Sequence, residues 1–142
     1  MRKKVSRSFF IAKEVLFIGY SQKHEVFCKM AADAFKKAGS HVYFVNPKGK
    51  WNDEMIYQSI ESVPTAPELA YVITKKEVTS TLLESIAKKG IKRILFNSYM
   101  SVDQPTLDRC KALGIETAVA CPMMALGGGF HRLHGFFAGV GK

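Results

Sequence analysis

One pattern is repeated three times along the chain: the end of a helix, a glycine, and then an apolar run. The repeats lie at residues 37–44, 89–96 and 112–119. A glycine just past a helix takes up the left-handed conformation that closes the last turn. The apolar runs are almost continuous, which is typical of parallel strands covered on both faces. The pattern predicts strands at about 14–19, 41–45, 69–73, 92–96 and 115–119.

The segments between these runs have the apolar spacing of helices. In the first, residues three and four apart would face a sheet, namely Val26, Phe27, Met30, Ala31, Ala34, Phe35 and Ala38. The second would bury Val78, Leu82, Leu83 and Ile86. The third would begin near Ser101 or Asp103, with Pro105 in its first turn. Strands alternating with helices predict an α/β fold, a single Rossmann-like doubly wound parallel sheet of about five strands with helices on both faces.

Length and composition fit one domain. We divide the 142 residues into a basic N-terminal arm (1–13), the α/β domain (14–124), and a Gly-rich linker with a C-terminal amphipathic helix (125–142). No apolar run approaches the roughly 20 residues that span a bilayer. Three widely separated cysteines indicate reduced thiols and a cytoplasmic protein. The net charge of +9 implies an acidic partner, which could be a nucleic acid, an anionic cofactor or a membrane surface.

Polar residues follow the first predicted strand. Gly19 would let a ligand approach the backbone, Ser21 offers a hydroxyl donor, and Lys23 and His24 add charge. The helix that follows would present free N–H groups and a positive dipole end to a phosphate. Ligands of doubly wound sheets lie beyond the strand carboxyl ends, at the switch in strand order. We therefore expect a nucleotide site here, although Gly19 could also do no more than turn the chain.

The end of the second predicted strand favours one class of nucleotide. NAD-binding domains usually place Asp or Glu here, to accept a hydrogen bond from the ribose 2′-hydroxyl. This chain has Asn46 instead, followed closely by Lys48 and Lys50. Ammonium groups without a carboxylate suit an adenosine whose ribose carries an extra phosphate, as in NADP or coenzyme A (CoA). The alternative is that both lysines are solvated loop charges.

Five short motifs occur in one fixed order. They are Ile18-Gly19-Tyr20-Ser21, Gly39 at a helix end, Val45-Asn46-Pro47, the segment 57–64 (YQSIESVP), and Cys121-Pro122. In this order, over about residues 14–124, they resemble the small stand-alone CoA-binding proteins. Those proteins are related to the CoA-binding domain of succinyl-CoA synthetase. Tyr20 stands where the family usually has alanine.

The resemblance implies that CoA or an acyl-CoA is held at these strand ends. The pyrophosphate would be held by Gly19, Tyr20 and Ser21. The adenosine and its ribose phosphate would be flanked by Val45, Asn46, Pro47 and Lys48. The other side of the site would be lined by Thr74 and Lys75.

Catalytic and metal sites have less support in the sequence. We identify no set of nucleophile, base and orienting residue, so we expect a binding protein and not an enzyme. His131 and His134 have a spacing that could ligate zinc, but no Cys-x-x-Cys pair accompanies them. Their segment is better explained as an amphipathic helix that packs on the domain or forms a homodimer, or that brings His131 and Arg132 to the ligand phosphates. Cys28 could form a mixed disulfide with the ligand thiol, but core packing is the preferred role.

Two other functions remain as alternatives. One is an NAD(P)-binding or redox-sensing module, since related domains occur in redox-sensing repressors. The other is a basic nucleic-acid-binding protein, which the net charge would suit. Exposed aromatic residues among the basic ones would support nucleic-acid binding, but most aromatics here lie in apolar runs typical of a core. We therefore expect no membrane or nucleic-acid partner, and a non-enzymatic CoA-binding function.

Overall fold

The computed structural model describes residues 7–126 of the chain. All strands of its single sheet are parallel, in the order β3-β2-β1-β4-β5-β6. The strands are β1 (Glu14–Ile18), β2 (His41–Val45), β3 (Ile56–Tyr57), β4 (Leu69–Val72), β5 (Arg93–Phe96) and β6 (Glu116–Val119). The helices are α1 (Glu25–Lys37), α2 (Lys76–Lys88), α3 (Gln104–Ala112) and α4 (Pro122–Leu126), with 3₁₀ turns η1 (Arg7–Phe10) and η2 (Gln22–His24). The predicted doubly wound fold is confirmed, with a sixth strand in addition.

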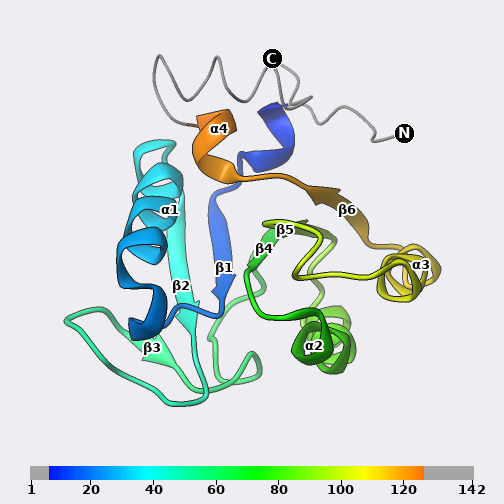
Figure 1. Cartoon of the computed structure of the whole chain (residues 1–142), viewed down its shortest axis with the longest axis horizontal. Coiled ribbons are helices and arrows are strands. Elements are labelled where there is room, and N and C mark those ends of the chain that lie inside the picture. Colours follow the sequence, from blue (N-terminus) through cyan, green and yellow to red (C-terminus); the bar gives the residue numbers. More distant parts are fainter. Residues whose placement is uncertain (1–6, 127–142) are drawn as a thin grey trace.

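Helices cover both faces of the sheet (Figure 1). Successive residues of a strand point to opposite faces, so the buried strands feed two separate cores. In β1, Val15 and Phe17 pack in the core beneath α1, whereas Leu16 and Ile18 pack in the core beneath α2 and α3. The near-continuous apolar runs of the sequence are thus explained by burial on both sides.

Helix α1 buries only part of the stripe that the sequence predicted. Val26 and Met30 are 73% and 46% exposed, while Ala32, which lay outside the predicted stripe, is 2% exposed. The residues facing the sheet are mostly small, namely Cys28, Ala31, Ala32, Ala34 and Phe35. Small side chains let the helix axis approach the sheet closely, and Phe17 and Tyr71 of the strands fill the space that remains.

The predicted helix ends of the repeated unit, and the predicted start of α3, are correct. Gly39, Gly90 and Gly114 each follow a helix and have positive φ angles of 97°, 87° and 76°. Asp103 is the N-cap residue of α3, and its carboxylate accepts a hydrogen bond from the Thr106 N–H at 3.0 Å.

Residues 7–13, which we assigned to the N-terminal arm, pack against the domain. Phe10 is fully buried in the core beneath α1. The Arg93 guanidinium donates hydrogen bonds to the carbonyl oxygens of Ser8, Phe9 and Ile11. The predicted Gly-rich linker and C-terminal helix, with His131, Arg132 and His134, lie almost wholly outside the described residues. Within residues 7–126, no helix is long and apolar enough to cross a membrane.

Candidate functional site

A groove of about 520 Å³ lies at the carboxyl ends of β1 and β2. The loop after β1 contributes Ser21, Gln22 and Lys23, and the loop after β2 contributes Asn46, Lys48, Gly49, Lys50 and Trp51. The groove adjoins the switch in strand order, because β1 is flanked by β2 on one side and β4 on the other. The two loops in which the sequence predicted a nucleotide site therefore meet in space.

Gly19 fixes the path of the first loop. Its φ of +103° lies in a region that side chains rarely adopt, and its N–H donates to the Val45 carbonyl at 3.1 Å. A Cβ at this position would lie 2.8 Å from Ile73 Cγ1 and 3.2 Å from Thr74 Cγ2. Glycine is thus required where the ends of β1 and β4 come together.

Asn46 joins the two loops. Its side-chain Nδ2 donates to the Tyr20 carbonyl at 2.9 Å, and its Oδ1 accepts from the Lys48 N–H at 2.9 Å. The second bond forms an Asx turn, a common device for reversing a chain. Asn46 is only 7% exposed, so both bonds are shielded from water. Its amide therefore sets the position of Lys48 relative to the loop after β1.

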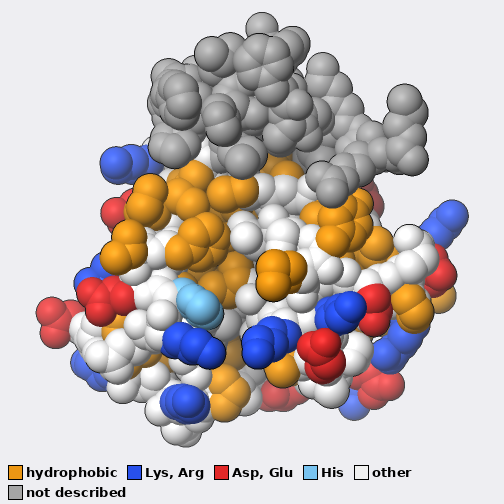
Figure 2. Space-filling model, in the orientation of Figure 1, with side chains coloured by type: hydrophobic (Ala, Val, Ile, Leu, Met, Phe, Trp, Pro, Cys, Tyr) orange, Lys and Arg blue, Asp and Glu red, His pale blue; other side chains and the backbone are white. Residues whose placement is uncertain are grey.

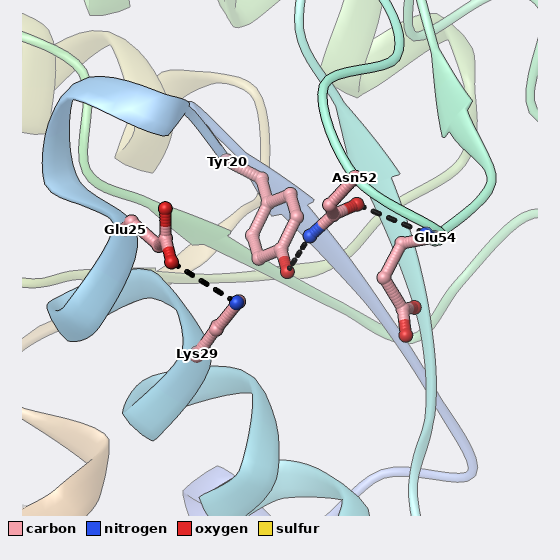
Figure 3. A network of polar contacts seen from close by, with 5 residues as sticks. All are labelled: Tyr20, Glu25, Lys29, Asn52 and Glu54. Carbon is pink, nitrogen blue, oxygen red and sulfur yellow. Dashed lines mark hydrogen bonds and ion pairs between the residues drawn. The ribbon is translucent and has the colours of Figure 1, made fainter.

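Tyr20 is part of the core, and its ring is not presented to a ligand. It is 2% exposed and packs between Phe44 and Trp51, with ring centroids 4.0 and 5.0 Å away. Figure 3 shows its hydroxyl directed at Asn52, whose Nδ2 donates to it at 3.0 Å. Burial raises the pKa of Tyr20, which keeps the phenol neutral. Tyr20 thus anchors the β2–β3 loop to the first loop, and it is not among the residues that line the groove.

The start of the first helix differs from the prediction. Ser21 is followed by the 3₁₀ turn η2, and α1 begins only at Glu25. Glu25 places a carboxylate in the first turn of α1, where it interacts favourably with the positive dipole end and also pairs with Lys29 (Figure 3). The helix end that we expected to attract a phosphate therefore already has a negative side chain.

The other predicted residues lie around the groove without lining it. Val45 is buried in the core beneath α2, and Pro47 and His24 are exposed. Thr74 lies beside Gly19, and its hydroxyl is 2.8 Å from that of Thr79. Lys75 is the exposed N-cap residue of α2. Thr74 and Lys75 are thus at the end of β4, on the far side of the β1 loop.

Positive charge dominates the groove. Lys23, Lys48 and Lys50 line it, and no lining residue is acidic. In the described part of the chain, no ion pair involves these three lysines. A second hollow of about 280 Å³ is different, because it is lined by Asp33, Asp53 and Glu54 as well as two lysines. Figure 2 shows basic side chains gathered beside a histidine on the lower half of one face.

Two of the three described thiols offer little chemistry to this site. Cys28 and Cys110 are fully buried, and burial raises the pKa of both, that of Cys110 to about 11. Burial of Cys28 agrees with the preferred core role and not with a mixed disulfide. Among residues 7–126, no group of three or more His, Cys, Asp or Glu side chains could hold a metal ion.

Sequence reasoning did not identify Trp51 as a site residue. Its indole lines the groove, and its Nε1 donates to the Tyr20 carbonyl at 3.2 Å. The available signal was a tryptophan, the only one in the chain, directly after the polar run Lys48-Gly49-Lys50. In the structure this indole both lines the groove and packs against the core beneath α1.

Comparisons with known proteins agree with this geometry. Residues 13–127 match a protein family described as CoA binding domain. Among solved structures, Prb, a PH1109 protein redesigned for binding, has a TM-score of 0.76 at 23% identity, covering 91% of this chain and 89% of its own. A hypothetical protein from Pyrococcus horikoshii OT3 has a TM-score of 0.73 at 25% identity, covering 84% and 87%. A Thermus thermophilus structure has a TM-score of 0.72 at 16% identity, covering 84% and 92%.

No curated protein sequence matches the chain. The match to the family extends over most of the chain and includes both loops of the groove, and the similar structures share the parallel α/β fold. The chain belongs to the CoA binding domain family.

Proposed function

We propose that this protein binds CoA, free or acylated, at the carboxyl ends of β1, β2 and β4 without catalysing a reaction on it. The observation that carries the proposal is the groove itself, in which three lysines face an open volume with no acidic neighbour. CoA carries a pyrophosphate and a ribose phosphate, so it would supply the missing negative charge. Membership of the family supports the same ligand.

The end of β2 favours CoA over NAD. Asn46 replaces the usual carboxylate, and its Oδ1 already accepts from the Lys48 backbone. The same turn holds Lys48 at the groove, where an ammonium group would meet a ribose phosphate. NAD has no phosphate on its adenosine ribose to meet these lysines, and its ribose hydroxyls would find no carboxylate among the lining residues.

The two loops suggest an orientation for the ligand. Lys48 and Lys50 would contact the ribose phosphate, and Ser21 and Lys23 the pyrophosphate. The pantetheine arm would then continue past Gly19 toward Thr74 and Lys75 at the end of β4. Gly19 has no side chain to obstruct this path, and it lies against Thr74.

A non-catalytic, cytoplasmic role is part of the proposal. Two of the three described thiols, Cys28 and Cys110, are buried with raised pKa values, which disfavours the nucleophilic thiolate form. No disulfide joins the described cysteines, which supports a reducing compartment. The three lysines line one groove of about 520 Å³, which suits a small anionic ligand better than a nucleic acid.

The test compares CoA binding to the unchanged protein with binding to a double variant, Lys48→Ala with Lys50→Ala. Each exposed charge-assisted contact contributes about 1–1.5 kcal/mol, so calorimetry should show CoA affinity falling by about 30- to 150-fold. Lys111→Ala removes an exposed lysine of α3 and should leave affinity unchanged. Equal affinity of the double variant and the control would refute the role of the groove. Salt-sensitive DNA binding that CoA does not displace would favour nucleic acid instead.

A further inference from the structure

The wall of the groove contains one aromatic ring. Its other lining residues carry hydroxyl, amide or ammonium groups, or no side chain at all. Such groups can bind phosphates and a ribose, but they offer no flat apolar surface to a nucleobase. Trp51 is half-buried and supplies the only ring among the lining residues.

The indole of Trp51 is held in place before any ligand arrives. Its Nε1 donates to the Tyr20 carbonyl at 3.2 Å, which fixes the ring in its plane. One side of the indole packs on the Tyr20 ring, with centroids 5.0 Å apart and planes inclined by 32°. Tyr20 in turn packs on Phe44, with centroids 4.0 Å apart. A side chain already ordered in this way loses little conformational entropy when a ligand contacts it.

We propose that Trp51 is the stacking surface for the purine base of the ligand and makes the groove selective for adenine-bearing molecules. This inference rests on the proposed function, because it concerns the same groove. The base would extend the series Phe44, Tyr20, Trp51 by one more ring. Lys48 and Lys50, three and one residues before Trp51, would then lie beside the ribose phosphate of the stacked adenosine.

A competing role for Trp51 is purely structural. The indole N–H could serve only to hold the Tyr20 carbonyl, in which case Trp51 would affect the loops and not the base. The two roles differ in which ligands are affected. Stacking should matter for every ligand with an adenine and not for pyrophosphate alone, whereas loss of a loop support should weaken both. Trp51→Phe separates the roles further, because it keeps a ring and removes the N–H.

The experiment titrates wild type, Trp51→Leu and Trp51→Phe with CoA, adenosine 3′,5′-bisphosphate, 4′-phosphopantetheine and pyrophosphate. Trp51→Leu should lower the affinity for CoA and for the bisphosphate by about 5- to 100-fold, the range measured for base stacking on aromatic side chains. The same variant should bind phosphopantetheine and pyrophosphate with affinities within about twofold of the wild-type values. Trp51→Phe should stay close to wild type for all four. If Trp51→Phe loses affinity for all four ligands to the same extent, the stacking role is overturned in favour of the structural one.

Fluorescence gives an independent reading, because Trp51 is the only tryptophan in the chain. Saturating CoA and adenosine 3′,5′-bisphosphate should both quench wild-type emission, and 4′-phosphopantetheine should not. If calorimetry detects no CoA binding to the wild type, the proposed function fails. If CoA binds but emission is unchanged and Trp51→Leu binds it equally well, only the stacking role of Trp51 fails.

Discussion

Asn46 Nδ2 donates a hydrogen bond of 2.9 Å to the carbonyl oxygen of Tyr20. The bond connects the loop after β2 to the loop after β1, and Trp51 Nε1 donates to the same carbonyl. Two side chains of one loop thus hold a single backbone atom of the other. The relative positions of Ser21 and Lys48, which both line the groove, depend on this arrangement.

Substitution of Asn46 should destabilise the protein and weaken the site together. Asn46→Ala removes a buried donor and acceptor, leaving the Lys48 N–H without its partner. Asn46→Asp keeps the acceptor but places a carboxylate against the Tyr20 carbonyl. We expect urea unfolding to show a loss of about 1–3 kcal/mol for each variant. CoA affinity, measured at a temperature where the variants are folded, should fall as well.

Asn52→Ala is a matched control for these variants. Asn52 also bonds to Tyr20, but to its hydroxyl and from a half-buried position outside the groove lining. Loss of this hydrogen bond should lower the free energy of unfolding by about 0.5–1.5 kcal/mol and leave CoA affinity nearly unchanged. The claim that Asn46 organises the site is contradicted if Asn46→Ala and Asn52→Ala have the same effect on CoA binding.

Gly19 and Gly39 should respond differently to the same substitution. Both have strongly positive φ angles, +103° and +97°. A Cβ on Gly39 would meet nothing within 4 Å, so Gly39→Ala should cost only the conformational strain of about 1 kcal/mol. A Cβ on Gly19 would lie 2.8 Å from Ile73 Cγ1. Because such overpacking is itself destabilising, Gly19→Ala should lower the free energy of unfolding by at least about 2 kcal/mol more than Gly39→Ala does. Equal unfolding midpoints in urea would show that β1 and β4 can separate freely.

Cys110 should make stability fall at alkaline pH. Burial raises its pKa from 9.0 to about 11, so the unfolded chain loses this proton first. The contribution to stability is therefore full below about pH 9 and is lost as the pH rises to about 11, by about 2–3 kcal/mol at most. Cys110→Ala should lose less stability than wild type between pH 8 and pH 10.5 in urea unfolding. If the stabilities of wild type and Cys110→Ala fall in parallel as the pH rises, groups other than Cys110 cause the effect.

The sequence predicts the sheet well because its strands are buried on both faces. An apolar run that alternates with glycine-terminated helices is readily assigned to a buried strand. All five predicted strands are present, and each of their ends lies within one residue of the prediction. The exception is β3, which consists only of Ile56 and Tyr57 and pairs with the end of β2. Two residues are too few to show the hydrophobic pattern of a strand. Because β3 forms only by pairing with β2, it cannot be predicted from its own sequence.

The site is less predictable because it depends on the direction of side chains. In α1, two overlapping stripes compete, and the larger residues Val26 and Met30 are exposed while smaller ones are buried. In the first loop, nothing local shows that the Tyr20 ring would pack between Phe44 and Trp51. Phe44 and Trp51 are distant in sequence from Tyr20, so the packing of these three rings follows only from the tertiary structure.

Calorimetry with CoA, dephospho-CoA and NAD would show whether the groove recognises the ribose phosphate of CoA. The groove lysines near the end of β2 should give CoA a tenfold or greater advantage over dephospho-CoA, which lacks the ribose phosphate. NAD should bind more weakly still, because Asn46 stands in place of a carboxylate. CoA binding in the micromolar range with this order of affinities is the predicted result. Equal affinity for CoA and dephospho-CoA, or tighter binding of NAD than of CoA, would contradict it.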